Sequence, residues 1–137
     1  GERVAVMMFD LDHFKEINDK CGHLAGDQAL VQVADAIRGI LTGDEFAARL
    51  GGDEFIIFFR SADEERVKEK IGQLQQELAG NPLVAGGERH PLRISVGVSF
   101  CPDQGGNSDT LINWADKALY HAKRSGRGRC AFASELE

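Results

Sequence analysis

The hydrophobic positions of the chain follow two patterns, and the first is typical of strands. Residues 4–9 and 55–59 are continuous apolar runs, as expected for strands buried on both faces. Residues 46–50 and 92–100 alternate apolar with other positions, which is the period of two that a half-buried strand requires. These runs predict four strands, and a short fifth strand is expected at residues 130–133.

The second pattern is a helical one. A mixed polar and apolar stretch at residues 13–20 predicts a short helix that Gly22 ends. Apolar residues then recur at helical spacing over residues 30–41, and Gly43 is expected to cap that helix.

Two longer helices are predicted further along the chain. Residues 67–78 carry one apolar stripe, with Ser61 and Glu64 as a capping box before it and residues 80–82 as its end. Residues 111–122 carry the stripe of the last helix.

These elements predict an α+β fold. Only residues 51–54 separate the second strand from the third, which suits a β-hairpin and excludes an all-parallel sheet. A ferredoxin-like core fits best, with helices packed on a largely antiparallel sheet of five strands. Residues 81–91 and 102–107 are predicted loops, and Trp114 and Tyr120 are expected to pack between the last helix and the sheet.

Composition and charge narrow the class of protein. The chain has 137 residues, 42% of them hydrophobic, which suits one domain spanning residues 1–137. Its net charge of −6 argues against binding a nucleic acid polymer, which depends on Lys and Arg. No apolar run approaches the roughly 18 residues of a membrane helix and no signal peptide is visible, so we expect a cytoplasmic domain without membrane contact.

The cysteines and the basic residues add two observations. Three cysteines without a CxxC pair favour small, partly buried thiols over disulfides or a zinc site. The positive charge is concentrated near the end of the chain, where it could hold a phosphorylated ligand. This basic corner consists of Lys123, Arg124, Arg127 and Arg129.

Acidic residues are predicted to meet at one edge of the sheet. In a ferredoxin-like core the end of the first strand, with Asp10 and Asp12, lies beside the start of the third, with Asp53 and Glu54. Carboxylates gathered in this way repel one another, and Mg²⁺ bound by oxygen ligands and phosphates would relieve the repulsion. Alternatively, they only cap a helix and flank a turn, but the double glycine before Asp53 leaves room for a ligand and favours the metal site.

Four blocks of sequence resemble the GGDEF domain family, and the resemblance extends over about residues 4–129. The blocks, in chain order, are FDLDHFKEINDKCGHLAGD (9–27), RLGGDEF (49–55), SVGV (95–98) and ADKALYHAK (115–123). The resemblance implies a palm-type fold similar to that of nucleotidyl cyclases. It also implies a diguanylate cyclase, a nucleotidyltransferase of bacterial signalling that condenses two GTP into cyclic di-GMP and two pyrophosphates.

The resemblance implies a role for three of the four acidic residues of the edge. Asp10, Asp53 and Glu54 would be catalytic. The same three residues and the Leu11 carbonyl would hold Mg²⁺, or Mn²⁺ in its place. Glu54 would also be a candidate base for the 3′-hydroxyl.

Further residues of the family motifs would bind GTP. Asn18 and Asp27 would recognise the guanine edge, since a carboxylate accepts from guanine N–H groups and an amide donates to its acceptors. Their alternative role is helix capping. The triphosphate would be held by backbone amides at the start of the first helix and by two cations one helical turn apart. These phosphate-binding residues are Phe14, Lys15, Lys123 and Arg127.

The family makes its product across a homodimer, in which each GTP is attacked by the 3′-hydroxyl of the other. The chain begins almost at the first strand, without the LTGL-like turn that usually precedes it. We therefore expect a fragment of a larger multidomain signalling protein, whose N-terminal sensory or dimerisation domain lies outside this chain and which could be membrane-anchored.

Two positions depart from the family pattern. The RxxD motif of product inhibition is replaced by residues 42–45, which read TGDE, so no inhibitory RxxD site is expected. The usual GRN near the end reads Gly126-Arg127-Gly128, which keeps the arginine.

Three other functions compete with the cyclase. The first is a non-catalytic module that binds GTP or cyclic di-GMP and regulates a partner domain. The others are a cyclase for a mixed dinucleotide and a purely structural dimerisation domain. The intact GGDEF motif, Asp27 and the acidic cluster favour the diguanylate cyclase.

Overall fold

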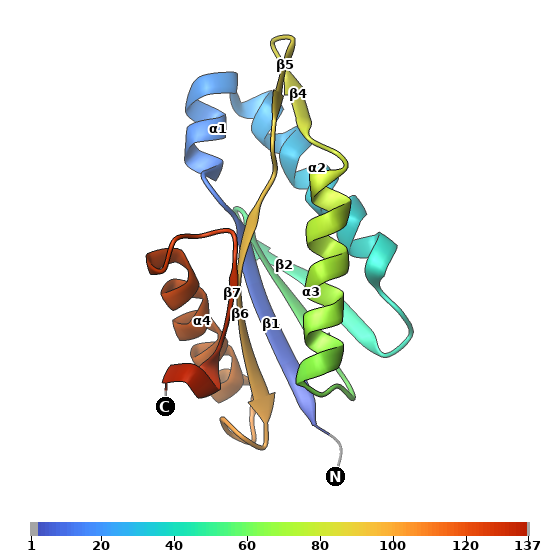
Figure 1. The fold of residues 1–137 in the computed structure, drawn as a ribbon, viewed down its shortest axis with the longest axis vertical. Coiled ribbons are helices and arrows are strands. Elements are labelled where there is room, and N and C mark those ends of the chain that lie inside the picture. The colour runs from blue at the N-terminus through green and yellow to red at the C-terminus, as the bar shows by residue number, and fades with distance from the viewer. Residues whose placement is uncertain (1–2, 137) are drawn as a thin grey trace.

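The computed structural model describes residues 3–136, which form one layered α+β unit (Figure 1). In chain order the elements are β1 (Val4–Leu11), α1 (Phe14–Cys21), α2 (His23–Ile40), β2 (Glu45–Gly51), β3 (Glu54–Phe59), α3 (Glu64–Ala79), β4 (Leu83–Ala85), β5 (Glu88–His90), β6 (Ile94–Cys101), α4 (Ser108–Arg124), β7 (Cys130–Phe132) and the 3-10 helix η1 (Ala133–Leu136).

The central sheet has five strands in the order β2-β3-β1-β6-β7. β1 lies in the middle and runs antiparallel to both β3 and β6, as the predicted core requires. The sheet is nevertheless mixed, because β7 pairs with β6 in parallel. After β6, α4 returns the chain to the end of the sheet at which β6 began. A strand that starts from that end and pairs with β6 must run parallel to it.

Helices cover both faces of the sheet. Met7 and Phe9 of β1 pack in the core under α2 and α3, whereas Val6 and Met8 pack under α4 on the opposite face (Figure 1). Alternate side chains of a strand point to opposite faces, so a strand covered on both sides is apolar at every position. This arrangement explains the unbroken hydrophobic run at the start of the sequence.

The predicted loop at residues 81–91 is wrong in part, because it contains a second, two-stranded sheet made of β4 and β5. Gly86 and Gly87, both at positive φ, form its turn, which is the conformation that a two-residue hairpin needs. Each strand has only three residues, too few to show a period of two. The loop at residues 102–107 is confirmed.

Two predicted helix caps are also corrected. α2 ends at Ile40, and the chain is extended before it reaches Gly43, so this glycine does not cap the helix. α3 begins after Asp63, whose carboxylate accepts a hydrogen bond from the backbone N–H of Arg66 at 2.9 Å. Asp63 therefore takes the capping role that the sequence suggested for Ser61.

Three predictions about side chains have different outcomes. Tyr120 is 61% exposed, with the Arg124 guanidinium above its ring, so its predicted place against the sheet is wrong. Trp114 is partly buried. The three cysteines are free and partly buried, as predicted.

Within residues 3–136 no helix has the length and apolar character needed to cross a membrane.

Candidate functional site

The predicted acidic edge forms where β1 ends beside β3. Asp10 is the direct partner of Glu54 in the antiparallel register. Asp53 precedes Glu54 in the turn that joins β2 to β3, after two glycines with positive φ. The Arg49 Nε donates to the carbonyl of Gly52 at 2.8 Å and braces this turn. The structure thus brings two distant segments of the sequence together at one edge.

Asp10 has an unusual environment within this edge. It is only 4% exposed, and the Lys123 ammonium of α4 donates to its Oδ2. Its other oxygen is buried without a hydrogen-bond partner. Burial raises the pKa of Asp10 above its ordinary value even though Lys123 lowers it, and the charges of Asp53 and Asp12 raise it further. The carboxyl group is therefore set to accept another positive partner.

This donor set fits a hard cation. Within residues 3–136 no three His, Cys, Asp or Glu side chains lie close enough together to hold a metal by themselves. Mg²⁺, however, is usually held by one or two carboxylates and completes its shell with phosphate and water oxygens. The unpartnered oxygen of Asp10 can supply one such ligand, and Asp53 and Glu54 lie at the same edge of the sheet. Leu11 is buried in the core, so only its carbonyl could contribute.

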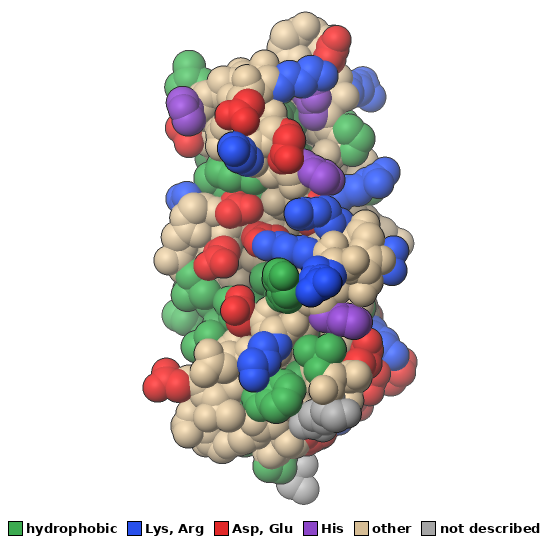
Figure 2. Space-filling model, turned by 90° about the vertical axis from the view of Figure 1, so that its left-hand side faces the viewer, with side chains coloured by type: hydrophobic (Ala, Val, Ile, Leu, Met, Phe, Trp, Pro, Cys, Tyr) green, Lys and Arg blue, Asp and Glu red, His purple; other side chains and the backbone are tan. Residues whose placement is uncertain are grey.

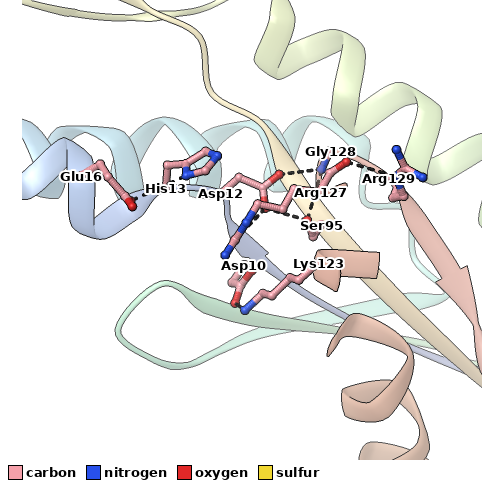
Figure 3. A network of polar contacts seen from close by, with 9 residues as sticks. All are labelled: Asp10, Asp12, His13, Glu16, Ser95, Lys123, Arg127, Gly128 and Arg129. Atoms are coloured by element: carbon pink, nitrogen blue, oxygen red, sulfur yellow. Dashed lines mark hydrogen bonds and ion pairs between the residues drawn. The ribbon is translucent and has the colours of Figure 1, made fainter. Parts of the chain in front are cut away.

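Asp12 lies close to Asp10 but makes quite different contacts (Figure 3). Its Oδ1 accepts from the Ser95 hydroxyl at 2.6 Å, and its Oδ2 accepts from the Gly128 backbone N–H at 2.8 Å. The Arg127 guanidinium lies 3.8 Å from Oδ1. Both oxygens of Asp12 are thus bonded within the protein, so the sequence-based grouping of Asp12 with the cation-binding carboxylates is not supported by its contacts.

The two predicted phosphate-binding cations approach the acidic edge from the same side. Lys123 lies near the end of α4 and Arg127 in the loop that follows, and their side chains contact Asp10 and Asp12 (Figure 3). Arg127 itself has a left-handed backbone with φ 62°. Its side chain remains 43% exposed, which leaves much of the guanidinium accessible to a ligand.

Acidic and basic side chains are interspersed on the face that carries α1 and α4, in the band between these helices (Figure 2). α1 begins in this region. His13, which precedes it, has a left-handed backbone and makes no side-chain cap. The first turn of a helix leaves its N–H groups without intrahelical partners. The amides of Phe14 and Lys15, at this turn, are therefore available for an anion.

The two candidate guanine-binding residues lie near each other. A Cβ placed on Gly26 would meet the Asn18 Oδ1 at 1.8 Å, so the Asn18 side chain of α1 packs directly on α2 one residue before Asp27.

Asp27 also borders a groove of about 620 Å³ between α2 and the β2–β3 hairpin. The sequence did not indicate this groove, because its walls come from segments that meet only in the fold. Among its other lining residues are Leu30, Val31, Ala34, Arg49 and Phe55.

The positions that match the inhibitory motif are engaged within the fold. The Thr42 hydroxyl donates to Glu45 at 2.6 Å, and Arg66 and Lys70 of α3 contact the same carboxylate at 3.2 and 3.1 Å. Burial alone would raise the pKa of Glu45, but the hydrogen bonds from Thr42, Lys70 and Arg66 together hold it below its ordinary value. An internal cluster occupies the positions where the family motif has Arg and Asp.

Comparison with known proteins identifies relatives of this fold and sequence. The model of the family described as "Diguanylate cyclase, GGDEF domain" matches residues 1–129. The diguanylate cyclase TpbB of Pseudomonas aeruginosa is 38% identical over 93% of this chain. The cyclic di-GMP phosphodiesterase PdeR of Escherichia coli is 36% identical over 99% of this chain. The chain spans only 29% and 21% of the lengths of these two relatives.

Solved structures agree with this relationship. The GGDEF domain of DgcB from Caulobacter crescentus, solved in complex with c-di-GMP, superposes with a TM-score of 0.89 at 32% identity. The match covers 98% of this chain and 80% of the DgcB chain.

Proposed function

Because this chain belongs to the GGDEF domain family, we propose that it is a diguanylate cyclase domain, which joins two GTP molecules into cyclic di-GMP and releases two pyrophosphates. The observation that carries the proposal is the pairing of Asp10 with Glu54 at the edge that Lys123 and Arg127 also reach. Carboxylates for a metal and cations for a triphosphate are the two requirements of nucleotidyl transfer.

Each group of residues has a role in this proposal. Asp10, Asp53, Glu54 and the Leu11 carbonyl would hold Mg²⁺. When bound, the ion would lower the pKa of the attacking hydroxyl and neutralise the leaving pyrophosphate. Glu54 lies beside Asp10 and is the candidate base for the 3′-hydroxyl.

Other residues would bind and orient the substrate. Asn18 and Asp27 would read the guanine, and adenine would leave the polar atoms of this pair unsatisfied. The β- and γ-phosphates would lie between the amides of the first turn of α1 and the cations Lys123 and Arg127. Catalysis would then come mainly from positioning and from neutralised charge.

The reaction requires two copies of the domain. One protomer holds one GTP, and the second phosphodiester bond needs a second GTP facing the first. We therefore propose that the domain acts as a homodimer, brought together by a sensory or dimerisation domain of a longer protein. A monomeric domain would bind GTP without turning it over.

A direct assay tests this function. The domain is fused to a dimeric coiled coil and incubated with GTP and Mg²⁺, and the product is identified by mass spectrometry. Cyclic di-GMP is expected, with at least a hundredfold loss in the Asp53→Ala variant, since removing a group that stabilises developing charge costs about that much. A folded dimer that binds GTP but forms no cyclic di-GMP would falsify the enzyme proposal.

One observation supports a second candidate function, a module that binds GTP or cyclic di-GMP without catalysis. One relative of similar identity is named a cyclic di-GMP phosphodiesterase, so this domain type also occurs in a protein named for the opposite activity. The same assay separates the two candidates, because the binding module would retain nucleotide in equilibrium dialysis and yield no product.

A further inference from the structure

We propose that Asp12 is a positioning residue that fastens the loop bearing Arg127 to the end of β1. Asp12 would thereby set where the Arg127 guanidinium meets a bound triphosphate. The inference rests on the proposed function in one respect, namely that Arg127 binds the phosphates of GTP.

The contacts of Asp12 come from two segments that are far away in the sequence. Ser95 of β6 donates to one oxygen at 2.6 Å, and the Gly128 N–H donates to the other at 2.8 Å (Figure 3). The Arg127 guanidinium adds an ion pair at 3.8 Å. The Asp12 side chain is only 3% exposed, and bonds to an ionised group are about twice as strong as neutral ones.

The loop needs such an anchor because of its backbone conformation. Gly126, Arg127 and Gly128 all have positive φ, and Arg127 adopts this conformation at φ 62° without being glycine. A strained residue of this kind persists only where its surroundings determine it. Backbone N–H groups in a turn can bind an anion, and here the Gly128 N–H donates to the carboxylate of Asp12.

Ser95 makes the anchor a three-way junction. Its hydroxyl donates to Asp12 and also accepts from the Gly128 N–H at 3.2 Å, so one side chain of β6 contacts both partners. Backbone bonds hold the flanking segments, since Asp12 N–H donates to the Arg93 carbonyl at 2.8 Å and Val96 N–H to the Arg129 carbonyl at 2.9 Å. The Arg127 N–H donates to the Ala122 carbonyl at 3.1 Å, which ties the loop back to α4. Asp12 adds the link between this loop and the end of β1, through Gly128 and the Arg127 guanidinium.

The two aspartates of the motif thus have separate roles. Asp10 keeps one buried oxygen without a partner, whereas both oxygens of Asp12 accept bonds from the protein. Asp10 has an oxygen open to an incoming cation, whereas each oxygen of Asp12 already accepts a bond that holds the loop. We therefore assign the contribution of Asp12 to phosphate binding through Arg127.

Nucleotide affinities test this assignment. The affinity of the domain for a non-cleavable GTP analogue and for GMP is measured by calorimetry in Mg²⁺, with and without Asp12→Ala. The variant is expected to bind the triphosphate about tenfold more weakly, a typical coupling for residues in one network, and GMP almost unchanged. Asp12→Asn should restore part of the loss, because its amide oxygen still accepts from Gly128.

A double-mutant cycle with Arg127→Ala identifies the route of the effect. If Asp12 acts through Arg127, the Asp12→Ala change should cost little once Arg127 is absent. An equal loss in both backgrounds, an equal loss for GMP and the triphosphate, or a shift in the Mg²⁺ concentration required for binding would each overturn the proposal.

Ser95→Ala is a further test of the anchor, and Ser99→Ala is its matched control. Ser99 lies on the same strand, is equally buried, and donates to the Leu111 carbonyl at 2.6 Å away from the site. Ser95→Ala should weaken triphosphate binding and Ser99→Ala should not. Equal effects would contradict the anchor.

Hydrogen exchange separates this inference from the proposed function. The Gly128 amide should exchange slowly in the wild type and faster in Asp12→Ala, whether or not nucleotide is present. If the wild type binds no GTP, the proposed function fails while the exchange rates still test the anchor. If GTP binds but the Gly128 amide is unprotected in the wild type, only the anchor fails.

Discussion

At the scale of single residues, two features of the candidate site can be tested directly: the packing of Asn18 on Gly26 and the burial of Asp10. Asn18 packs against Gly26 so closely that a methyl group there would overlap its amide oxygen at 1.8 Å. Asp10 is buried with one oxygen unpartnered. Each position can be tested by one substitution.

We expect Gly26→Ala to displace Asn18 and weaken nucleotide binding. The clash is with the end of a side chain that can rotate away, so we expect little change in unfolding free energy, whereas the guanine-binding amide would have to move. Gly39→Ala in the same helix is the control, because nothing lies within 4 Å of its Cβ position. That change should stabilise the domain by about 0.4–1 kcal/mol. Urea unfolding and GTP titration measure both effects, and equal behaviour of the two variants would contradict this account.

Asp10→Asn should stabilise the fold and remove activity. The pKa of Asp10 is raised in the folded state, so ionising this group destabilises the fold as the pH rises from the ordinary aspartate pKa through the raised one. At pH 7 the wild type bears this full cost and the asparagine variant does not. Thermal unfolding between pH 3 and pH 7 should show the advantage of the variant growing with pH. A variant less stable than the wild type at pH 7 would refute the idea that ionised Asp10 destabilises the fold.

At the scale of elements, a buried charge cluster connects the end of α2 and the start of β2 to α3. Lys70 is only 4% exposed, donates to the Ile40 carbonyl and pairs with Glu45. The ammonium thus satisfies a carbonyl at the helix end and a buried carboxylate at the same time. Arg66 completes the cluster at its exposed side.

Lys70→Met should therefore destabilise the domain by about 3 kcal/mol at pH 7, because it leaves a buried carboxylate with fewer partners. The lowered pKa of Glu45 means that its contribution is present above the ordinary glutamate pKa and is lost as the pH falls through the folded value. The difference between variant and wild type should shrink in acid. Lys68→Met is the control and should change little, because Lys68 makes an exposed pair with Glu64 on the same helix and a distant cation–π contact with Phe132 at 5.6 Å.

At the scale of the whole molecule, α4 is packed on the sheet without spare room. A Cβ on Gly97 of β6 would lie 2.1 Å from the Ala115 carbonyl oxygen and 2.2 Å from the Leu119 nitrogen. These are backbone atoms, so no side chain can rotate away. Because α4 carries Lys123, this packing also sets the distance between the cations and the acidic edge.

Gly97→Ala should shift α4 and reduce both stability and nucleotide binding. We expect a loss of about 3 kcal/mol or more in unfolding free energy, at the upper end for overpacked cores. Gly72→Ala in α3 is the control, since its Cβ position is open. Chemical unfolding and binding of the GTP analogue measure the two properties. Wild-type affinity in a folded Gly97→Ala variant would show that α4 does not set the cation position.

Sequence patterns predicted much of the fold correctly. The helices and the five strands of the main sheet follow from periodicity, because a helix or strand that covers a core must repeat its apolar residues with its own geometry. The β4–β5 hairpin was missed because its strands are only three residues long. The parallel pairing of β7 was missed because strand direction depends on the path of the chain and not on local residue types.

The sequence by itself determined the family and the residue types of the site, because four motifs in order match this family along nearly the whole chain. The family motif singled out Asp10 as catalytic, but only the tertiary structure gave Asp12 a role of its own. Asp10 and Asp12 are equally acidic in the sequence, yet one faces Lys123 with an oxygen left unpartnered and the other is held by Ser95 and Gly128. Hydrogen-bond partners more than eighty residues away decide this difference, and local sequence carries no record of them.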